Sequence, residues 1–189
     1  PYVVGSDFVG EEISDIAELR TVIEQIVTGI ASRDRDWTIR VHAGENDSLK
    51  SNMAKAIDLV EQSLLPGQEF PYMRIGHGLY CAKLGSRQGK ELLAKIKAHD
   101  IVLEFQLTSN VRLNNIIDLR RHPLKSYLAS GIGCVMGTDG CGLYGTDGID
   151  EQLALANFLD VTDSEFLQMK KAEMAREAGK LSALNPLSV

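Results

Sequence analysis

A unit of strand, loop and helix recurs about every 30 residues along the chain, and this repeat constrains the fold more than any other feature. Short apolar or β-branched runs without clean alternation predict strands that are buried on both faces, which is typical of parallel sheets. The predicted strands are Tyr2–Val4, Trp37–Val41, Met73–Ile75, Ile101–Phe105 and Gly133–Met136. Strands that alternate with helices leave two architectures, an open doubly wound sheet and a (β/α)8 barrel.

Helical patterns lie between these strands. Apolar residues that recur three and four positions apart predict one amphipathic helix from Ile16 to Ile30, opened by Ser14 and Asp15. Further helices are predicted over 51–64, 86–99 and 123–131, and in a C-terminal tail that starts with the capping box Thr162–Glu165.

Polar residues gather near the end of each predicted strand, and this placement favours the barrel. They are Asp7, His42, Glu45, His77, Glu104, Ser109, Asn110, Thr138 and Asp139. A barrel would direct all the strand ends at one pocket, whereas an open sheet would concentrate function at one switch point. About five strands cannot close an eight-stranded barrel. Either this α/β chain with its helical tail lacks three strands of a (β/α)8 barrel, or the barrel interpretation is wrong.

Composition argues against several classes of function. The 20 Lys and Arg residues against 26 Asp and Glu residues give a net charge of −6, which argues against a nucleic-acid backbone binder. No apolar stretch approaches the roughly 18 residues of a membrane span, and the first residues do not resemble a signal peptide. Three cysteines without a C-x-x-C pair fit a reducing, cytoplasmic setting. We expect these cysteines to pack as small buried hydrophobes, at positions Cys81, Cys134 and Cys141.

Three polar residues near predicted strand ends are candidate metal ligands: His42, His77 and Asp139. Imidazole and carboxylate groups suit zinc, and a catalytic zinc site uses about three or four protein ligands and leaves one position for water. Glu45 follows His42 by three residues, near enough to act as acid and base on a metal-bound water. The alternative is structural, since polar residues after a strand are also typical of a solvated turn, and Glu104 could be a paired structural carboxylate.

Five sequence blocks follow one another along the chain. They are VVGSDFVGEE at 3–12, HAGE at 42–45, RIGHG at 74–78, Glu104 with Ser109-Asn110, and GTD at 137–139. In this order they resemble the adenosine/AMP deaminase family of the amidohydrolase superfamily. The resemblance implies a (β/α)8 barrel that holds one zinc ion, whose bound hydroxide attacks C6 of a purine and expels ammonia.

The resemblance also implies a role for each matching residue. His42 and Asp139 would ligate zinc, Glu45 would carry a proton to the purine ring, and His77 would orient the attacking hydroxide. Substrate contacts are expected at Asp7, Gly10 and Gly140.

Three departures from the family pattern qualify these roles. The family's His-x-His ligand pair is absent, so we expect residues 1–189 to be the C-terminal portion of a single hydrolase barrel, containing strands 4–8. An N-terminal partner segment would then supply the remaining zinc ligands. Gly140 replaces an aspartate that contacts the purine, a loss of roughly 1.5–3 kcal/mol, so the substrate need not be adenosine. Finally, Gln106-Leu107 replaces a Cys-Pro pair.

Three functions therefore remain open. The favoured one is zinc-dependent hydrolytic deamination of a purine nucleoside or a related aryl amine. The others are a catalytically inactive, deaminase-like binding or regulatory module, and another amidohydrolase-type hydrolase that acts on an amide or a lactone. For the favoured function the expected partner is a small-molecule substrate, and neither nucleic acid nor membrane is expected as a partner.

Several other motifs are interpreted as structural. The segment 140–145 satisfies G-x-G-x-x-G, but the expected helix and parallel strand do not follow, so we predict a flexible glycine-rich loop over the pocket. Asp147 is interpreted as a turn residue, and His99 and His122 as local helix caps.

Overall fold

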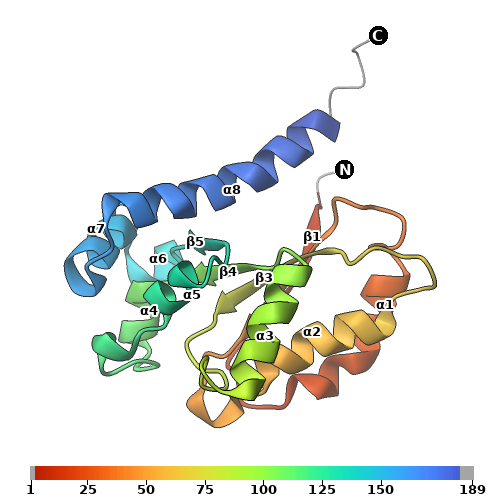
Figure 1. Cartoon of the computed structure of the whole chain (residues 1–189), viewed down its shortest axis with the longest axis horizontal. Helices are drawn as coiled ribbons and strands as arrows, with labels where there is room; N and C mark the ends of the chain where they lie inside the picture. Colours follow the sequence, from red (N-terminus) through yellow and green to blue (C-terminus); the bar gives the residue numbers. More distant parts are fainter. Residues whose placement is uncertain (1–2, 184–189) are drawn as a thin grey trace.

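The computed structural model describes residues 3–183 and places five parallel strands in one sheet (Figure 1). The strands are β1 (Gly5–Phe8), β2 (Thr38–Ala43), β3 (Tyr72–His77), β4 (Val102–Phe105) and β5 (Cys134–Met136). Their order in the sheet is the order along the chain, with every neighbouring pair parallel. A doubly wound sheet reverses its strand order at a switch point, so this sequential order confirms the incomplete barrel.

Helices connect the strands and cover the outer face of the sheet. They are α1 (Arg20–Thr28), α2 (Asn52–Ser63), α3 (Arg87–Ala98), α4 (Leu107–Arg112), α5 (Leu124–Ala129), α6 (Cys141–Tyr144), α7 (Gly148–Leu159) and α8 (Asp163–Ala183). Short 3-10 turns are η1 (Ile16–Leu19), η2 (Asp47–Leu49) and η3 (Leu119–Arg121). Figure 1 shows α1, α2 and α3 together on one side of the strands, and α8 packs against β5. Within the described chain, no helix has the length and apolar character that crossing a membrane requires.

The outer face of the sheet forms the hydrophobic core. Alternate residues of the three central strands point toward the helices and are fully buried: Ile39, Val41, Met73, Ile75, Leu103 and Phe105. Burying an aliphatic or aromatic side chain of this size contributes about 1.5–3 kcal/mol to stability. This face therefore holds the strands in the register that positions their ends.

The inner face of the same strands carries charged residues. Asp7, Arg40 and Arg74 are aligned across β1, β2 and β3. The guanidinium of Arg40 donates to Asp7 Oδ2 at 2.7 Å and to Glu104 Oε1 at 2.7 Å. Arg74 Nη2 lies 3.1 Å from Glu104 Oε2. The barrel interior below the strand ends is therefore an ion-paired layer and not an apolar one.

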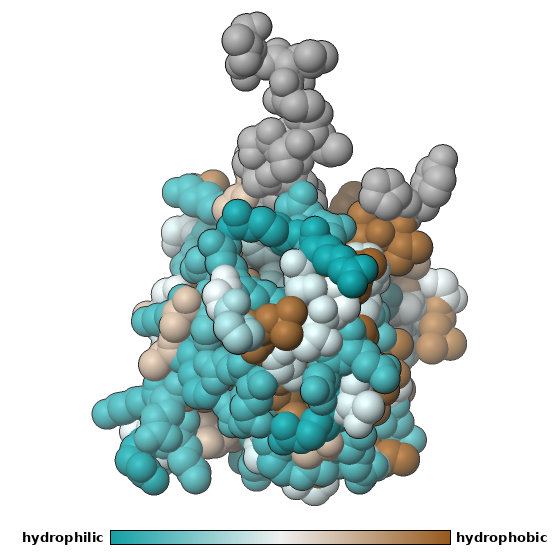
Figure 2. Space-filling model, turned by 90° about the vertical axis from the view of Figure 1, so that its right-hand side faces the viewer, coloured by the Kyte–Doolittle hydropathy of each residue, from teal (hydrophilic) through white to brown (hydrophobic). Residues whose placement is uncertain are grey.

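The first strand differs from its prediction over Tyr2–Val4. Strand β1 begins at Gly5, and Val3 and Val4 are exposed, while Tyr2 lies outside the described residues. A Cβ at Gly5 would lie 2.6 Å from the Thr38 carbonyl oxygen, so glycine permits the close pairing with β2. Figure 2 shows hydrophobic surface gathered near this end of the described chain. Pairing with β2 therefore decides where β1 lies, whereas hydropathy alone favours the preceding valines.

Three local predictions also differ from the structure. The amphipathic segment divides into η1 and α1, and Leu19, Val22 and Ile30 of its predicted apolar stripe are exposed. The predicted loop over 140–145 is largely the short helix α6. This helix exposes Cys141, which therefore does not pack as a buried hydrophobe. All three cysteines are unpaired; Cys134 is buried and Cys81 is half-buried.

Candidate active site

The candidate site lies where β2 and β3 end. His42 is the next-to-last residue of β2, and His77 is the last residue of β3. The parallel register pairs His77 with Ala43, the residue that follows His42. Gly76 lies opposite His42, and a Cβ there would come within 3.4 Å of the imidazole. A Cβ at Gly76 would therefore make an ordinary van der Waals contact with the His42 ring on the inner face.

The backbone of His77 adopts an unusual conformation. Its φ is +68°, in the left-handed region that a non-glycine residue seldom occupies, and Gly78 follows at +57°. Such a conformation costs on the order of 1–3 kcal/mol, and it persists only where the surroundings hold it. Here it turns the buried His77 ring toward His42, so that the two strand ends share one polar cluster.

A chain of short polar contacts links Asn110 and the two histidine rings. Asn110 Oδ1 lies 2.9 Å from His77 Nδ1, and His77 Nε2 lies 2.9 Å from His42 Nδ1. With the carbonyl of Asn110 as acceptor, His77 Nδ1–H donates to it, and His77 Nε2 accepts from His42 Nδ1–H. His42 Nε2 then carries a lone pair, and this buried atom has no hydrogen-bond partner.

Three residues of this cluster could hold a metal ion. One potential ligand atom from each of His42, Glu45 and His77 lies within 4.8 Å of the others. Asp139 lines the same cleft, although it is not in this closest group. A neutral imidazole with a free ring nitrogen and nearby carboxylates form the donor set that zinc prefers.

Electrostatics favour the neutral, ligating form of His42. Burial lowers the pKa of His42 below its ordinary value of 6.5, and His77 and the Arg40 guanidinium lower it further. The carboxylates of Asp7 and Asp139 act in the opposite direction. Near neutral pH the ring is therefore uncharged, which is the state that binds a metal.

The carboxylate of Asp7 lies near the free ring nitrogen of His42. Its Oδ1 lies 3.6 Å from His42 Nε2, while its Oδ2 accepts the hydrogen bond from Arg40. Arg40 therefore holds the Asp7 carboxylate beside the free ring nitrogen. The sequence places Asp7 after a strand, but the structure places it within β1 on the inner face.

Glu45 has the environment of a proton carrier. Burial raises the pKa of Glu45 above its ordinary value, opposed by His77, and the charges of Asp139 and Glu12 raise it further. Asn115 Nδ2 donates to Glu45 Oε1 at 2.6 Å and fixes the carboxyl group. The same oxygen lies 3.7 Å from His77 Nε2. A carboxyl group with a raised pKa is suited to general acid–base chemistry.

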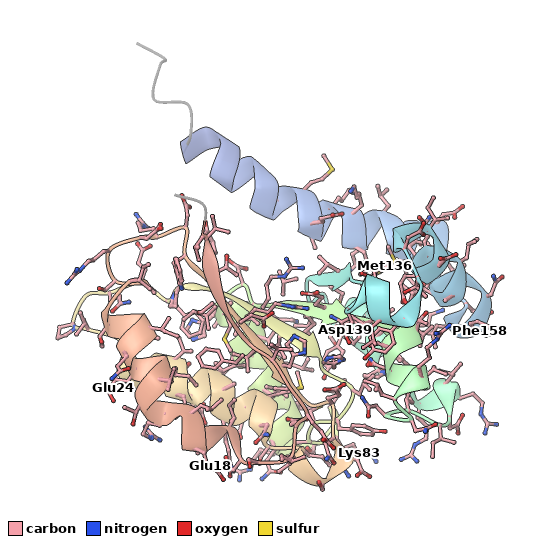
Figure 3. The ribbon with its side chains drawn as sticks, turned by 180° about the vertical axis from the view of Figure 1, so that it is seen from behind. Glu18, Glu24, Lys83, Met136, Asp139 and Phe158 are labelled. Carbon is pink, nitrogen blue, oxygen red and sulfur yellow. The ribbon has the colours of Figure 1, made fainter. Side chains whose placement is uncertain are left out.

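These groups open into a cleft of about 1390 Å³. Its walls include Gly10, Tyr80 and Tyr144 as well as the His42 cluster. Figure 3 shows Asp139 near the middle of the molecule, beside α6 and well away from Glu24 on α1. Gly10 has φ +139° and open space where a Cβ would point, so its backbone is accessible. Gly140 follows Asp139 and caps α6.

Some contacts in the site are not evident from sequence. Asn115 lies in a loop segment without a motif, so only the tertiary fold indicates its contact with Glu45. Arg40 looks like an ordinary polar position in a strand. Asn110 belongs to one of the quoted blocks, but its contact with His77 depends on how α4 follows β4.

Other polar residues have structural partners. Glu104 pairs with Arg40 and Arg74, in agreement with its structural alternative. His99 ends α3, yet its ring binds Glu61 of α2 and stacks on Phe70, so it does more than cap locally.

His122 Nδ1 accepts from the backbone of Leu124, which is a local capping contact. Asp147 is the N-cap of α7 and forms a capping box with Asp150.

Comparisons with known proteins identify one family. The family described as Adenosine deaminase matches residues 3–184. An adenosine deaminase of Plasmodium falciparum (isolate 3D7) is 28% identical over 168 residues, which are 88% of this chain and 40% of that protein. One of Escherichia coli (strain SMS-3-5 / SECEC) is 33% identical over 125 residues, 66% of this chain and 33% of that protein. The chain thus spans well under half the length of these curated relatives.

Solved structures share the fold. The adenine deaminase of Arthrobacter aurescens superposes with a TM-score of 0.68 at 20% identity, over 92% of this chain and 46% of that one. The N6-mAMP deaminase of Arabidopsis superposes with a TM-score of 0.59 at 16% identity, over 92% of this chain and 53% of that one. At these identities the likeness shows the fold alone, and it matches this chain to about half of each structure.

Proposed function

The chain belongs to the adenosine deaminase family, and we propose that it serves the hydrolytic deamination of a purine nucleoside or a related aryl amine, with release of ammonia. The observation that carries this proposal is the buried group of His42, Glu45 and His77, whose potential ligand atoms lie within 4.8 Å of one another and which lines the cleft.

We propose distinct roles for the residues of the site. Zinc held by His42 and Asp139 would activate water at neutral pH. Glu45 would deliver a proton to the purine ring, and its raised pKa keeps a larger fraction protonated near neutrality. His77 would orient the attacking water, with its own ring held by Asn110.

Substrate contacts are proposed at the edges of the cleft. The backbone of Gly10 would meet the purine edge, and Asp7 would contribute a carboxylate held by Arg40. Gly140 lacks the carboxylate that the family pattern carries, so recognition of the base would differ there. A Cβ at this position would lie 3.3 Å from Cβ of the exposed Leu143, so an aspartate fits if Leu143 shifts slightly.

The barrel is proposed to be completed by strands outside residues 1–189. The five described strands and the match to about half of each solved deaminase support this proposal. The added strands would supply the further metal ligands and cover the ion-paired inner face. We also propose a cytoplasmic location, since all three cysteines are unpaired.

Elemental analysis combined with an ammonia-release assay tests the proposal. The samples are this chain and a version extended upstream through the remaining strands, each assayed with adenosine, AMP and adenine. About one zinc per extended chain, little zinc in the shorter one and ammonia release by the extended chain are expected. His42→Ala should remove the zinc.

Other results would favour the alternative functions. Zinc without ammonia release from any purine would favour a hydrolase that acts on an amide or a lactone. No zinc in either sample would favour an inactive binding module. Gly140→Asp in the extended chain should strengthen adenosine turnover, and an unchanged kcat/KM would contradict the proposed role of this position.

A further inference from the structure

Glu12, in the loop between β1 and η1, makes four hydrogen bonds to the segment that follows β2. Its Oε2 accepts from the backbone N–H groups of Glu45 and Asn46, each at 2.7 Å. Its Oε1 accepts from Gly44 N–H at 3.1 Å and from Asn52 Nδ2 at 2.9 Å. A single carboxylate thus holds three successive backbone amides, and the central one belongs to Glu45.

The backbone of this segment is shaped for an anion. Gly44 adopts φ +74°, and a Cβ there would lie 2.6 Å from the carbonyl oxygen of Tyr80, so no other residue fits without a shift. A left-handed residue within a tight turn lets successive N–H groups converge, which creates a concave anion site. Glu12 fills this site with charge-assisted hydrogen bonds, the stronger class in proteins.

Two further contacts join the same loops. Asn46 Nδ2 donates to the backbone carbonyl of Glu12 at 3.0 Å. Asn52, in the first turn of α2, donates to the Ser14 carbonyl at 3.1 Å and accepts from Ile16 N–H at 3.2 Å. The loop that follows β1 and the segment that carries Glu45 are therefore tied together at several points.

We propose that Glu12 is a positioning residue, which holds the backbone of residues 44–46 so that the Glu45 carboxyl stays beside His77 and Asn115. These hydrogen bonds of the Glu12 carboxylate, called the clamp below, also fix the position of Glu45 relative to Gly10. Gly10 lies two residues before Glu12 in the chain. This inference rests on the proposed deaminase function. Glu12 uses both of its oxygens within the protein, so it acts through Glu45 and not on the reacting atoms.

Glu12→Gln tests the proposal in the active, zinc-loaded protein. The amide keeps the size of the side chain but has one acceptor oxygen in place of two, and its NH2 group faces an N–H donor. Misplacement of a catalytic group can cost on the order of 10²-fold, so we expect kcat to fall by about tenfold to a hundredfold. Zinc content should stay at the wild-type level, and KM should change much less than kcat.

Glu24→Gln is the matched control, because it removes the same charge from an exposed position on α1, far from the cleft (Figure 3). Its kcat and KM should equal those of the wild type. If Glu12→Gln retains the full kcat of an active wild type, the positioning role is wrong. An equal loss of kcat in Glu12→Gln and Glu24→Gln would also overturn the positioning role, because a general effect of the removed charge would then explain both losses.

Amide hydrogen exchange separates this inference from the proposed function. In Glu12→Gln the amides of Gly44, Glu45 and Asn46 should exchange faster than in the wild type, while those of β3 stay protected. Unchanged exchange at these three amides would overturn the clamp, whatever the activity. A wild-type protein that binds zinc and releases no ammonia would instead overturn the deaminase function, and the exchange result would still decide whether Glu12 holds the loop.

Discussion

The two faces of the sheet differ sharply although they alternate along the same strands. Outward residues such as Ile75 are fully buried against helices, whereas the adjacent inward residue Arg74 is part of an ion-paired layer. The outer face supplies stability through apolar contacts, and the inner face supplies the polar groups of the candidate site. Neighbouring residues of one barrel strand therefore serve different purposes, one in the apolar core and the next in the candidate site. A substitution on the outer face should change the free energy of unfolding, whereas one near the site should change kcat or zinc binding.

The largest expected effect is at Glu45, which follows the inner-face residue His42 just beyond the end of β2. Glu45→Gln removes the proposed proton carrier and should lower kcat by roughly 10²–10⁴-fold, the usual contribution of general acid–base catalysis. Unfolding by urea and zinc content should both match the wild type, because Glu45 is proposed to lie outside the metal's ligands. Loss of zinc in this variant would instead make Glu45 a ligand.

On the outer face, Ile75→Ala should lower stability with little effect on the site. The side chain is fully buried in the core, and truncation of such a residue costs about 2–5 kcal/mol. Urea unfolding followed by circular dichroism measures the change. The folded fraction should bind as much zinc as the wild type. A selective loss of zinc affinity without loss of stability would show that the two faces are not separable in this way.

His122 is a buried histidine beside the outer face, and unlike His42 and His77 it lies outside the candidate site. Burial lowers the pKa of His122 from 6.5 to about 4, and its ring lies 5.5 Å from that of Phe105. The unfolded chain binds this proton below about pH 6.5, whereas the folded chain binds it only near pH 4. Stability should therefore fall as the pH drops from 6.5 to 4, by on the order of 3 kcal/mol at most.

Urea unfolding at pH 7 and pH 5 measures this dependence. His122→Asn keeps an acceptor for the Leu124 N–H and removes the titrating ring. The loss of stability between the two pH values should be smaller in the variant. An equal loss in both proteins would assign the pH dependence to other groups.

A smaller effect is expected at Asn110, which orients the inner-face histidines. Asn110→Ala removes the acceptor of the His77 Nδ1–H group, so the tautomers of His77 and His42 are no longer held. The direct hydrogen-bond partner of a ligating histidine typically accounts for a 10–100-fold change in metal affinity. Because Asn110 acts on His42 through His77, we expect a change of about tenfold. Chelator competition should show weaker zinc binding by about this factor. Asn110→Asp retains an acceptor and should bind zinc more tightly than Asn110→Ala; if both bind equally, the orienting role fails.

The smallest effect is expected at Arg74. Its side chain is 40% exposed and its ion pair with Glu104 is partly screened, so Arg74→Met should change stability by less than about 1 kcal/mol. Comparison with Ile75→Ala on the same strand is direct, because the two residues are neighbours on opposite faces. If Arg74→Met lowered stability as much as Ile75→Ala, the proposed difference between the two faces would be wrong.

Much of the architecture is predictable from sequence because it depends on local patterns. The apolar runs that became β2, β3 and β4 bury one face in the helical core, and each is bounded by polar residues. The exception is β1, where the exposed Val3 and Val4 were favoured over Gly5–Phe8. Its position depends on backbone pairing with β2, which no local apolar pattern reports.

The candidate site is predictable in part for the same reason. His42, Glu45 and His77 follow from strand ends and the quoted blocks, and the structure brings the three together. Their roles stay predictions, as does that of Asp139, which shares the cleft without joining the closest group.

The sequence by itself determined the repeat of strand and helix, the polar residues at the strand ends and the resemblance to one family. Only the tertiary structure decided which atoms meet: the free Nε2 of His42, the Asn115 contact to Glu45 and the clamp made by Glu12. The physical reason is that hydropathy and turn preferences act between residues near in the chain. Hydrogen bonds between side chains 30 or more residues apart exist only once the parallel register has aligned the strand ends.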